Sequence, residues 1–120
     1  MLFRSALATV AMVAKAHALS AIDSSFRDPR DPDAFRIACE EGRELGYDGK
    51  AITSPALARI ADEAFGPTPA EIDWSERVLA AAAAAPAGRQ VKVDGQLIEP
   101  GYLDVARTIA EQAKWPRLGR

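Results

Sequence analysis

The chain has 120 residues, 15 of them basic and 17 acidic, so its formal net charge is −2. This balance excludes the strongly basic surface that nucleic-acid-binding proteins use. The length suits about one small domain, and 48% of the residues are hydrophobic, which is enough for a core. The only cysteine, Cys39, has no partner for an internal disulfide. We therefore expect a globular protein with no nucleic-acid partner.

Residues 3–17 are rich in alanine, and Phe3, Leu7 and Val10 recur at helical spacing, which predicts a helix with one apolar face. The same stretch resembles a short secretory signal, with Ala16-His17-Ala18 as a cleavage site. Lys15 directly after the apolar run favours the helix. The run is too short to span a membrane. We therefore expect a cytoplasmic protein with no membrane partner.

The segment 18–23 reads as a short strand that ends at Asp23. Four aspartates lie between positions 23 and 33, but their spacing does not match a calcium loop. Capping explains the last ones better, since Asp31 suits the N-cap of a helix that begins at Pro32. The lone His17 has no second ligand near it and does not indicate a metal site.

A helix over residues 32–45 is predicted to bury Phe35, Cys39 and Gly42. Cys39 on that face indicates a small buried hydrophobe rather than a reactive thiol. Gly46 closes the helix. A short apolar strand over 50–53 and a helix over 54–65 follow, the latter capped by Ser54. The alternation of helices and strands predicts an α/β fold with a parallel sheet.

The C-terminal half begins with a capping box formed by Thr68 and Glu71, which starts a helix of about fifteen residues. A hairpin over residues 90–98 is predicted because Asp94-Gly95 favours a tight turn between antiparallel strands. A last helix starts after Glu99.

Several segments resemble the citrate lyase beta subunit / HpcH-HpaI aldolase family of CoA-ester lyases. Residues 45–50 match its Leu-Gly-Phe-x-Gly-Lys segment, and residues 62–69 match Asn-Glu-x-Phe-x-Pro-[Ser/Thr]-Pro. Residues 94–99 match Asp-Gly-Lys-[Met/Leu]-Ile-[Asp/Glu]. The chain departs from the family at Ser54, where the family has His, and at Leu57, where it has Gln. The resemblance covers roughly residues 3–114.

The resemblance implies a (β/α)8 TIM barrel, which needs about 250 residues. Only its C-terminal portion would be present here. Residues 1–67 would hold the last two βα units of a partial barrel. Residues 68–120 would form a C-terminal extension made of a helix, a hairpin and a lid helix.

In such lyases a carbon–carbon bond is cleaved or formed between an acyl-CoA and a 2-oxo acid. The resemblance implies Mg²⁺, held by one Glu and one Asp, as cofactor and a CoA thioester as substrate. Those metal ligands lie on earlier strands and have no counterpart in this chain, so we expect no metal site here and no complete catalytic site.

Two residues are candidates for a role in the site. The resemblance implies that Glu99, on the lid, is a catalytic proton donor or base in a neighbouring subunit's site; alternatively, Glu99 merely leads into the last helix. Asp23 matches the end of a family strand and would lie on the catalytic face, where it would bind substrate. Lys50, at the start of its predicted strand, would lie on the opposite face and be structural.

Three hypotheses on function stay open. The chain is the C-terminal part of a CoA-ester lyase that is catalytically incomplete alone, or a non-catalytic oligomerisation or lid module or gene remnant, or a small exported helical protein. The first requires as partner a homo-oligomer or a chain that supplies the missing strands. Unpaired strand edges predict that the isolated chain self-associates or is poorly stable.

Overall fold

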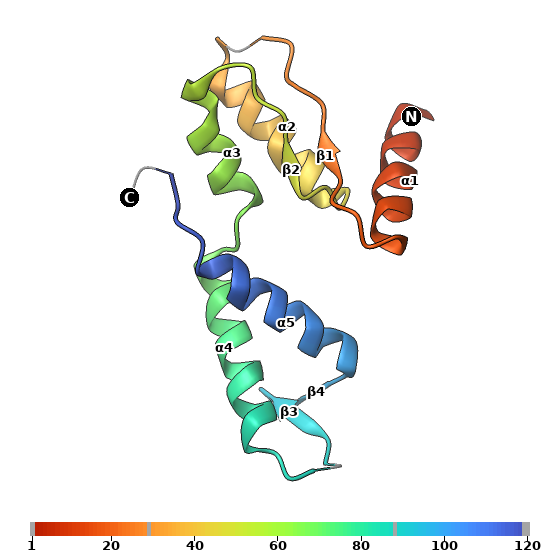
Figure 1. Cartoon of the computed structure of the whole chain (residues 1–120), viewed down its shortest axis with the longest axis vertical. Helices are drawn as coiled ribbons and strands as arrows, with labels where there is room; N and C mark the ends of the chain where they lie inside the picture. Colours follow the sequence, from red (N-terminus) through yellow and green to blue (C-terminus); the bar gives the residue numbers. More distant parts are fainter. Residues whose placement is uncertain (1, 29, 88, 119–120) are drawn as a thin grey trace. The chain divides into compact units, whose positions relative to one another are not determined.

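The computed structural model describes residues 2–28, 30–87 and 89–118 (Figure 1). It is an α/β chain that divides into two compact units. The first unit runs to Phe65 and includes the C-terminal tail from Arg117, and the second is Gly66–Pro116. The elements in chain order are α1 (Leu2–Ala16), β1 (Ile22–Asp23), α2 (Pro32–Glu44), β2 (Gly49–Lys50), the 3₁₀ helix η1 (Pro55–Leu57), α3 (Ala58–Phe65), α4 (Pro69–Ala84), β3 (Val91–Val93), β4 (Gln96–Ile98) and α5 (Pro100–Ala113).

The first unit contains the predicted parallel sheet. β1 and β2 pair in parallel, with Ile22 opposite Gly49 and Asp23 opposite Lys50 (Figure 1). The strands are two residues long, so the predicted bounds of 18–23 and 50–53 are wrong. The segment 51–53 is exposed, including Ile52 at 39%. A strand buried on both faces needs a second covering layer, and the described residues supply none over this segment.

Two apolar clusters hold the first unit together. Phe35, Cys39, Leu57 and Ala64 form one, and Ala11, Ala21 and Tyr47 form the other. The prediction that Cys39 is a small buried residue is confirmed, since it is fully buried. Burial raises the pKa of the Cys39 thiol, and the nearby Lys50 ammonium only partly offsets this.

The predicted ends of α2 are confirmed. The Asp31 carboxylate accepts a hydrogen bond from the Ala34 N–H at 2.9 Å and so caps the helix. Gly46 has a φ of +96°, which glycine adopts without the steric cost of a side chain. Ser54 occupies the N-cap position before η1, but its side chain makes no capping hydrogen bond.

The second unit also follows the predicted order. The capping box of Thr68 and Glu71 is present at the start of α4. Asp94 and Gly95 both have positive φ values, of 51° and 78°, as a tight hairpin turn between β3 and β4 requires. The core of this unit is built from Val78, Ile98 and Ala106, with further residues of the hairpin, α4 and α5 packed around them.

The C-terminal tail is bound to α3 of the first unit. The Arg117 Nη1 donates to the Asp62 carbonyl at 3.0 Å, and the Leu118 N–H donates to the Asp62 carboxylate at 3.1 Å. In the described part of the chain, no helix is long and apolar enough to cross a membrane.

Candidate functional site

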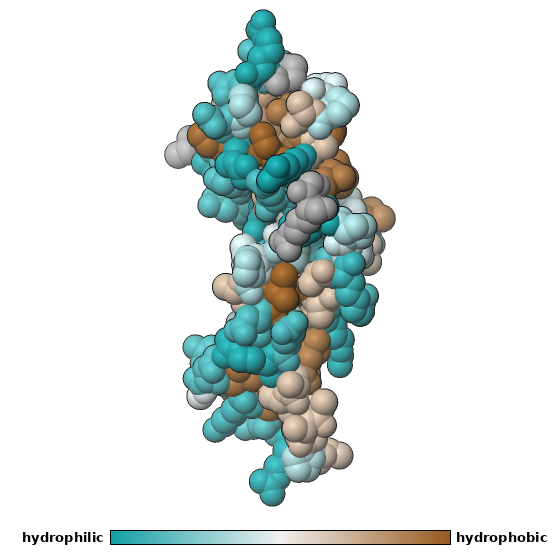
Figure 2. Space-filling view, turned by 90° about the vertical axis from the view of Figure 1, so that its left-hand side faces the viewer, coloured by the Kyte–Doolittle hydropathy of each residue, from teal (hydrophilic) through white to brown (hydrophobic). Residues whose placement is uncertain are grey.

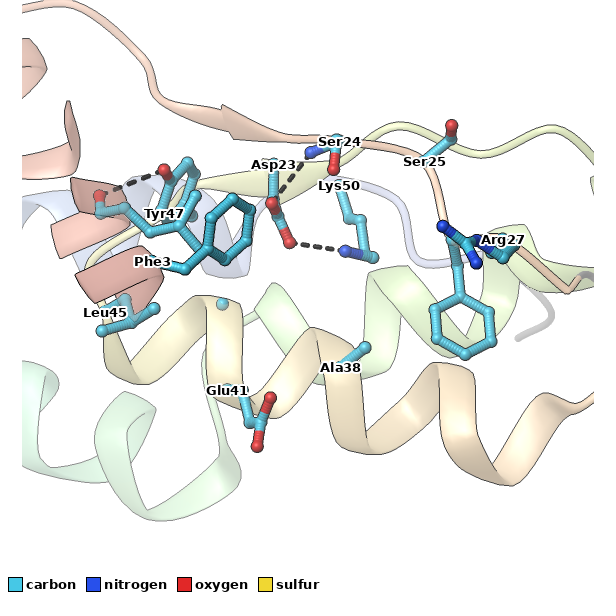
Figure 3. Close-up of a pocket in the computed structure, with 13 residues that line it drawn as sticks. Phe3, Asp23, Ser24, Ser25, Arg27, Ala38, Glu41, Leu45, Tyr47 and Lys50 are labelled. Carbon is cyan, nitrogen blue, oxygen red and sulfur yellow. Dashed lines mark hydrogen bonds and ion pairs between the residues drawn. The ribbon is translucent and has the colours of Figure 1, made fainter. Parts of the chain in front are cut away.

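The carboxyl ends of the two parallel strands carry an ion pair. Lys50 Nζ donates to Asp23 Oδ2 at 2.5 Å, and the Ser24 N–H donates to Asp23 Oδ1 at 2.8 Å (Figure 3). The side chains of Lys50 and Asp23 are only 6% and 15% exposed. Both oxygens of Asp23 are therefore bonded within the chain. That Asp23 also binds substrate stays a prediction.

The expectation that Lys50 lies on the face opposite to Asp23 is wrong. It assumed that Lys50 begins a strand over residues 50–53, whereas β2 ends at Lys50. Because parallel strands run in the same direction, the last residues of β1 and β2 meet at the same edge. The signal that could have found the pair is the charge complementarity of two residues at the ends of neighbouring predicted strands.

Helix α2 approaches this ion pair closely at Gly42. A Cβ atom at Gly42 would lie 3.3 Å from Asp23 Oδ2 and 3.4 Å from the Phe65 ring. The Asp23 side chain therefore points from the sheet towards α2. This position explains the burial of the pair and leaves little room for a side chain at Gly42.

A pocket of about 250 Å³ lies beside the ion pair (Figure 3). Its lining includes two cationic side chains, Lys50 and Arg27, and two carboxylates, Asp23 and Glu41. These charges balance, so the pocket has no excess positive charge for an anion. The Tyr47 hydroxyl, also in the lining, donates to the Leu7 carbonyl of α1 at 3.1 Å and holds that wall in place.

Glu99 lies in the second unit, at the N-cap of α5. Glutamate is a poor residue for this position, and its side chain makes no capping hydrogen bond. The side chain is exposed, and within the described residues its carboxylate has no hydrogen-bond partner. Glu99 therefore presents a free carboxylate to the solvent. Its side chain does not stabilise α5 by a capping hydrogen bond.

Glu99 is one of the residues that line a second pocket, of about 360 Å³. Apolar residues of the hairpin and of α5 line much of it, among them Val91, Ile98 and Leu103, and the polar residues Arg89 and Gln90 also line it. An acid next to an apolar pocket is an arrangement that can transfer protons to or from a bound organic group. Asp23 and Glu99 belong to different units of the chain.

The described residues do not form a cluster of ligands for magnesium. Among the described residues, no group of three or more His, Cys, Asp or Glu side chains could hold a metal ion. Asp23 is also neutralised by the ammonium of Lys50. Ser54, which is predicted to stand where the family has histidine, is half-buried at the N-cap of η1 and is not an ionisable ligand.

Comparison with known proteins gives several relatives. The chain is 36% identical over 105 residues to a (3S)-malyl-CoA thioesterase of Cereibacter sphaeroides, which covers 86% of this chain and 37% of that protein. It is 39% identical over 102 residues to a citrate lyase subunit beta-like protein of Deinococcus radiodurans, covering 83% and 36%. It is 38% identical over 72 residues to the mitochondrial citramalyl-CoA lyase of Mus musculus, covering 60% and 21%.

The chain belongs to the citrate lyase beta subunit family. No family model matches it. The chain spans about 37% of the length of the Cereibacter sphaeroides thioesterase. A solved structure with the same fold is the protein CitE from Mycobacterium tuberculosis, in complex with magnesium, acetoacetate and coenzyme A. The likeness has a TM-score of 0.76 at 22% identity and covers 94% of this chain and 42% of CitE.

Proposed function

We propose that this member of the citrate lyase beta subunit family is the C-terminal part of a CoA-ester lyase, with Glu99 as its catalytic acid or base. The observation that carries the proposal is the free Glu99 carboxylate at the head of α5, beside an apolar pocket. In this proposal residues 1–67 are the last two βα units of a TIM barrel, and residues 68–120 are the lid extension.

The chemistry assigned to Glu99 follows from the reaction. When the carbon–carbon bond breaks, the substrate hydroxyl loses its proton and becomes the carbonyl of the 2-oxo acid. The electron pair of the broken bond stays on the carbon next to the thioester, and that carbon must receive a proton. A carboxylic acid held beside it can supply the proton, and its carboxylate can remove the proton in the reverse direction. The remaining catalytic groups, including the magnesium ligands, would come from polypeptide outside these 120 residues.

That polypeptide would be either a separate subunit or the part of the same barrel that carries its earlier strands. Asp23 would contribute to substrate binding only indirectly, through the pocket beside its ion pair with Lys50. We keep the cytoplasmic location as a prediction.

Thioester hydrolysis is a second candidate reaction, because the relatives at 36% identity are named malyl-CoA thioesterases. In hydrolysis a carboxylate such as Glu99 would take a proton from the attacking water. The two reactions have different products: the lyase releases a 2-oxo acid and retains the thioester in the product acyl-CoA, whereas hydrolysis releases free CoA thiol.

The test is a chimera in which this chain replaces the matched segment of the Cereibacter sphaeroides thioesterase. We expect the chimera to cleave malyl-CoA and Glu99→Gln to lower the rate about 10²- to 10⁴-fold, as loss of a general acid or base does. The matched control is Glu76→Gln, another exposed glutamate of the second unit, which should leave the rate unchanged.

The products identify the reaction, with 2-oxo acid indicating a lyase and free thiol alone indicating a thioesterase. A folded chimera without either activity would refute the catalytic proposal and favour a non-catalytic lid or oligomerisation module. Equal rates for the wild-type chimera and the Glu99→Gln variant would remove Glu99 from the mechanism.

A further inference from the structure

The pocket beside Glu99 brings three polar residues together at the open end of the hairpin. In the ladder between β3 and β4, Val91 lies opposite Ile98. Gln90 and Glu99 are the residues that flank this pair on the side away from the turn, and Arg89 precedes Gln90. All three polar residues line the pocket, together with the two strand residues.

The three polar side chains have no partners among the described residues. Arg89, Gln90 and Glu99 make no side-chain hydrogen bond and no ion pair there, although Arg89 and Glu99 carry opposite charges. The backbone of Arg89 is held in place, since its N–H donates to the Pro86 carbonyl at 3.0 Å. A guanidinium offers a planar fork of donors that matches a carboxylate. Arg89 is therefore available to bind the carboxylate of a ligand.

The rest of the lining is apolar and consists of Val91, Leu97, Ile98, Pro100 and Leu103. Apolar side chains also reach the solvent elsewhere on this molecule, as Figure 2 shows for the face that it presents, so an apolar lining alone does not indicate a ligand. A volume of about 360 Å³ with a few polar groups among apolar ones is the usual composition of a small-molecule site. The combination fits a ligand with a hydrocarbon body and one anionic end.

The position of Glu99 limits which part of the substrate this ligand can be. A 2-oxo acid such as glyoxylate has almost no hydrocarbon for the apolar lining. The phosphates of CoA are separated from the thioester by the long pantetheine arm. The chain of the acyl group, in contrast, is attached to the carbon on which Glu99 would act, so it is the part that enters a pocket beside Glu99.

We propose that this pocket receives an acyl chain that ends in a carboxylate, and that Arg89 binds the carboxylate. The substrates would then be CoA thioesters whose cleavage releases a 2-oxo acid and the CoA thioester of a dicarboxylic acid. Arg89 is the residue that determines this specificity, through paired hydrogen bonds to the carboxylate. The inference rests on the proposed function, since Glu99 must act on the carbon that bears the chain.

The test is a calorimetric titration of the full 120-residue chain with hexanoate, which represents the hydrocarbon chain and its carboxylate. Hexanamide has the same chain without the charge, and acetate has the charge without the chain. We expect hexanoate to bind, and both other compounds to bind at least about 10-fold more weakly, because each lacks one of the two interactions.

Substitutions then test Arg89 itself. Arg89→Gln should weaken hexanoate binding about 10- to 100-fold, as the loss of hydrogen bonds to a charged group does. Lys92→Gln is the matched control, because it removes the same charge from an exposed residue of the same hairpin that does not line the pocket. It should leave the affinity unchanged. Arg89→Lys, which keeps the charge but not the fork of donors, should retain part of the affinity.

Three results would overturn the inference: no binding of hexanoate, equal binding of hexanamide, or equal affinities for the wild-type chain and Arg89→Gln. Glyoxylate is titrated in parallel, and tighter binding of glyoxylate than of hexanoate would show that the pocket holds the 2-oxo acid instead. The comparison of hexanoate with hexanamide uses the unsubstituted chain, so it tests the preference for an anion independently of how the variants fold.

The titrations do not depend on catalysis. Glu99→Gln should not weaken hexanoate binding, since the carboxylate of the ligand is bound by Arg89. Binding through Arg89 together with a chimera that is inactive would support the pocket while refuting the catalytic role of Glu99. An active chimera that depends on Glu99, together with no binding of hexanoate, would overturn this inference and leave the proposed function in place.

Discussion

At the scale of single residues, Asp48 joins the end of α1 to β1. Its carboxylate accepts hydrogen bonds from the Lys15 ammonium and from the Ala21 N–H, the latter at 2.8 Å. Burial acts to raise the pKa of Asp48, but the hydrogen bonds from Lys15 and Ala21 outweigh it and hold the pKa below its usual range. Asp48, which lies 27 residues after Ala21 in sequence, thus ties the end of α1 and the start of β1 to the segment that leads into β2.

The lowered pKa predicts a pH-dependent stability. A carboxyl group with a folded pKa below its unfolded value stabilises the protein above the unfolded value of about 4, and this contribution is lost as the pH falls through the folded pKa. We expect Asp48→Asn to lower the free energy of unfolding by about 1–2 kcal/mol at pH 7 and by less below pH 4.

Urea unfolding at pH 7 and pH 3 measures this difference. Asp104→Asn is the control, because Asp104 is paired with Arg107 on an exposed helix surface and should contribute at most about 1 kcal/mol at either pH. An Asp48→Asn deficit that stays constant between the two pH values would contradict the role given to its charge.

Because Asp23 and Lys50 form a buried ion pair, we expect the effect of substituting one of them on the free energy of unfolding to depend on the other. Lys50→Met keeps the length of the side chain but leaves the Asp23 carboxylate buried without its cation. We expect a loss of about 3 kcal/mol in the free energy of unfolding, because a buried charge without a partner is costly. Asp23→Asn in the Lys50→Met background should recover part of that loss.

A double-mutant cycle by urea unfolding tests the coupling. Single losses that simply add in the double variant would show that the two side chains act independently. That result would also remove the ion pair as the reason for the close approach of α2.

At the scale of the elements, α2 depends on the glycine that faces this ion pair. Alanine is favoured over glycine inside a helix by up to about 1 kcal/mol. At Gly42 the added Cβ would lie 3.3 Å from Asp23 Oδ2, and Asp23 cannot move away freely because Lys50 and the Ser24 N–H hold it. The steric conflict should therefore exceed the gain in helix propensity.

We expect Gly42→Ala to lower the free energy of unfolding by about 1–2 kcal/mol, as overpacking does. Gly101→Ala is the matched control, since a Cβ at Gly101 in α5 meets nothing within 4 Å. It should be neutral or stabilising by up to about 1 kcal/mol. Thermal or urea unfolding of both variants measures the two changes in stability. If Gly42→Ala is stabilising, the Asp23 side chain moves away from the added Cβ and the expectation is wrong.

At the scale of the whole molecule, the chain exposes large hydrophobic side chains, Ile22 of β1 among them. Along α1 the exposed fractions are 76% for Phe3, 57% for Val10 and 52% for Val13. Together with the edge of β1 that is unpaired within the described residues, these side chains give the isolated chain surfaces that favour association.

We expect the isolated chain to self-associate, with a mass above that of the monomer and rising with concentration. Light scattering over a concentration series measures the mass. Because association would be driven by apolar surface, sulfate should strengthen it. A monomer of constant mass that melts in a single cooperative transition would contradict the prediction.

The sequence alone determined the features that depend on near neighbours. Asp31 before Pro32, the Thr68 and Glu71 capping box and the Asp94-Gly95 turn were predicted from spacing and are present in the structure. Each is formed by backbone and side-chain groups within a few residues of one another, so the local sequence contains all of the interacting partners.

Only the tertiary structure decided the extent of the strands and the position of Lys50. Where a strand ends depends on its hydrogen-bonding partner, and Asp23 and Lys50 are 27 residues apart in sequence. The burial of their ion pair further requires that α2 approach at Gly42. No local pattern contains these contacts, because they exist only once β1, β2 and α2 have packed together.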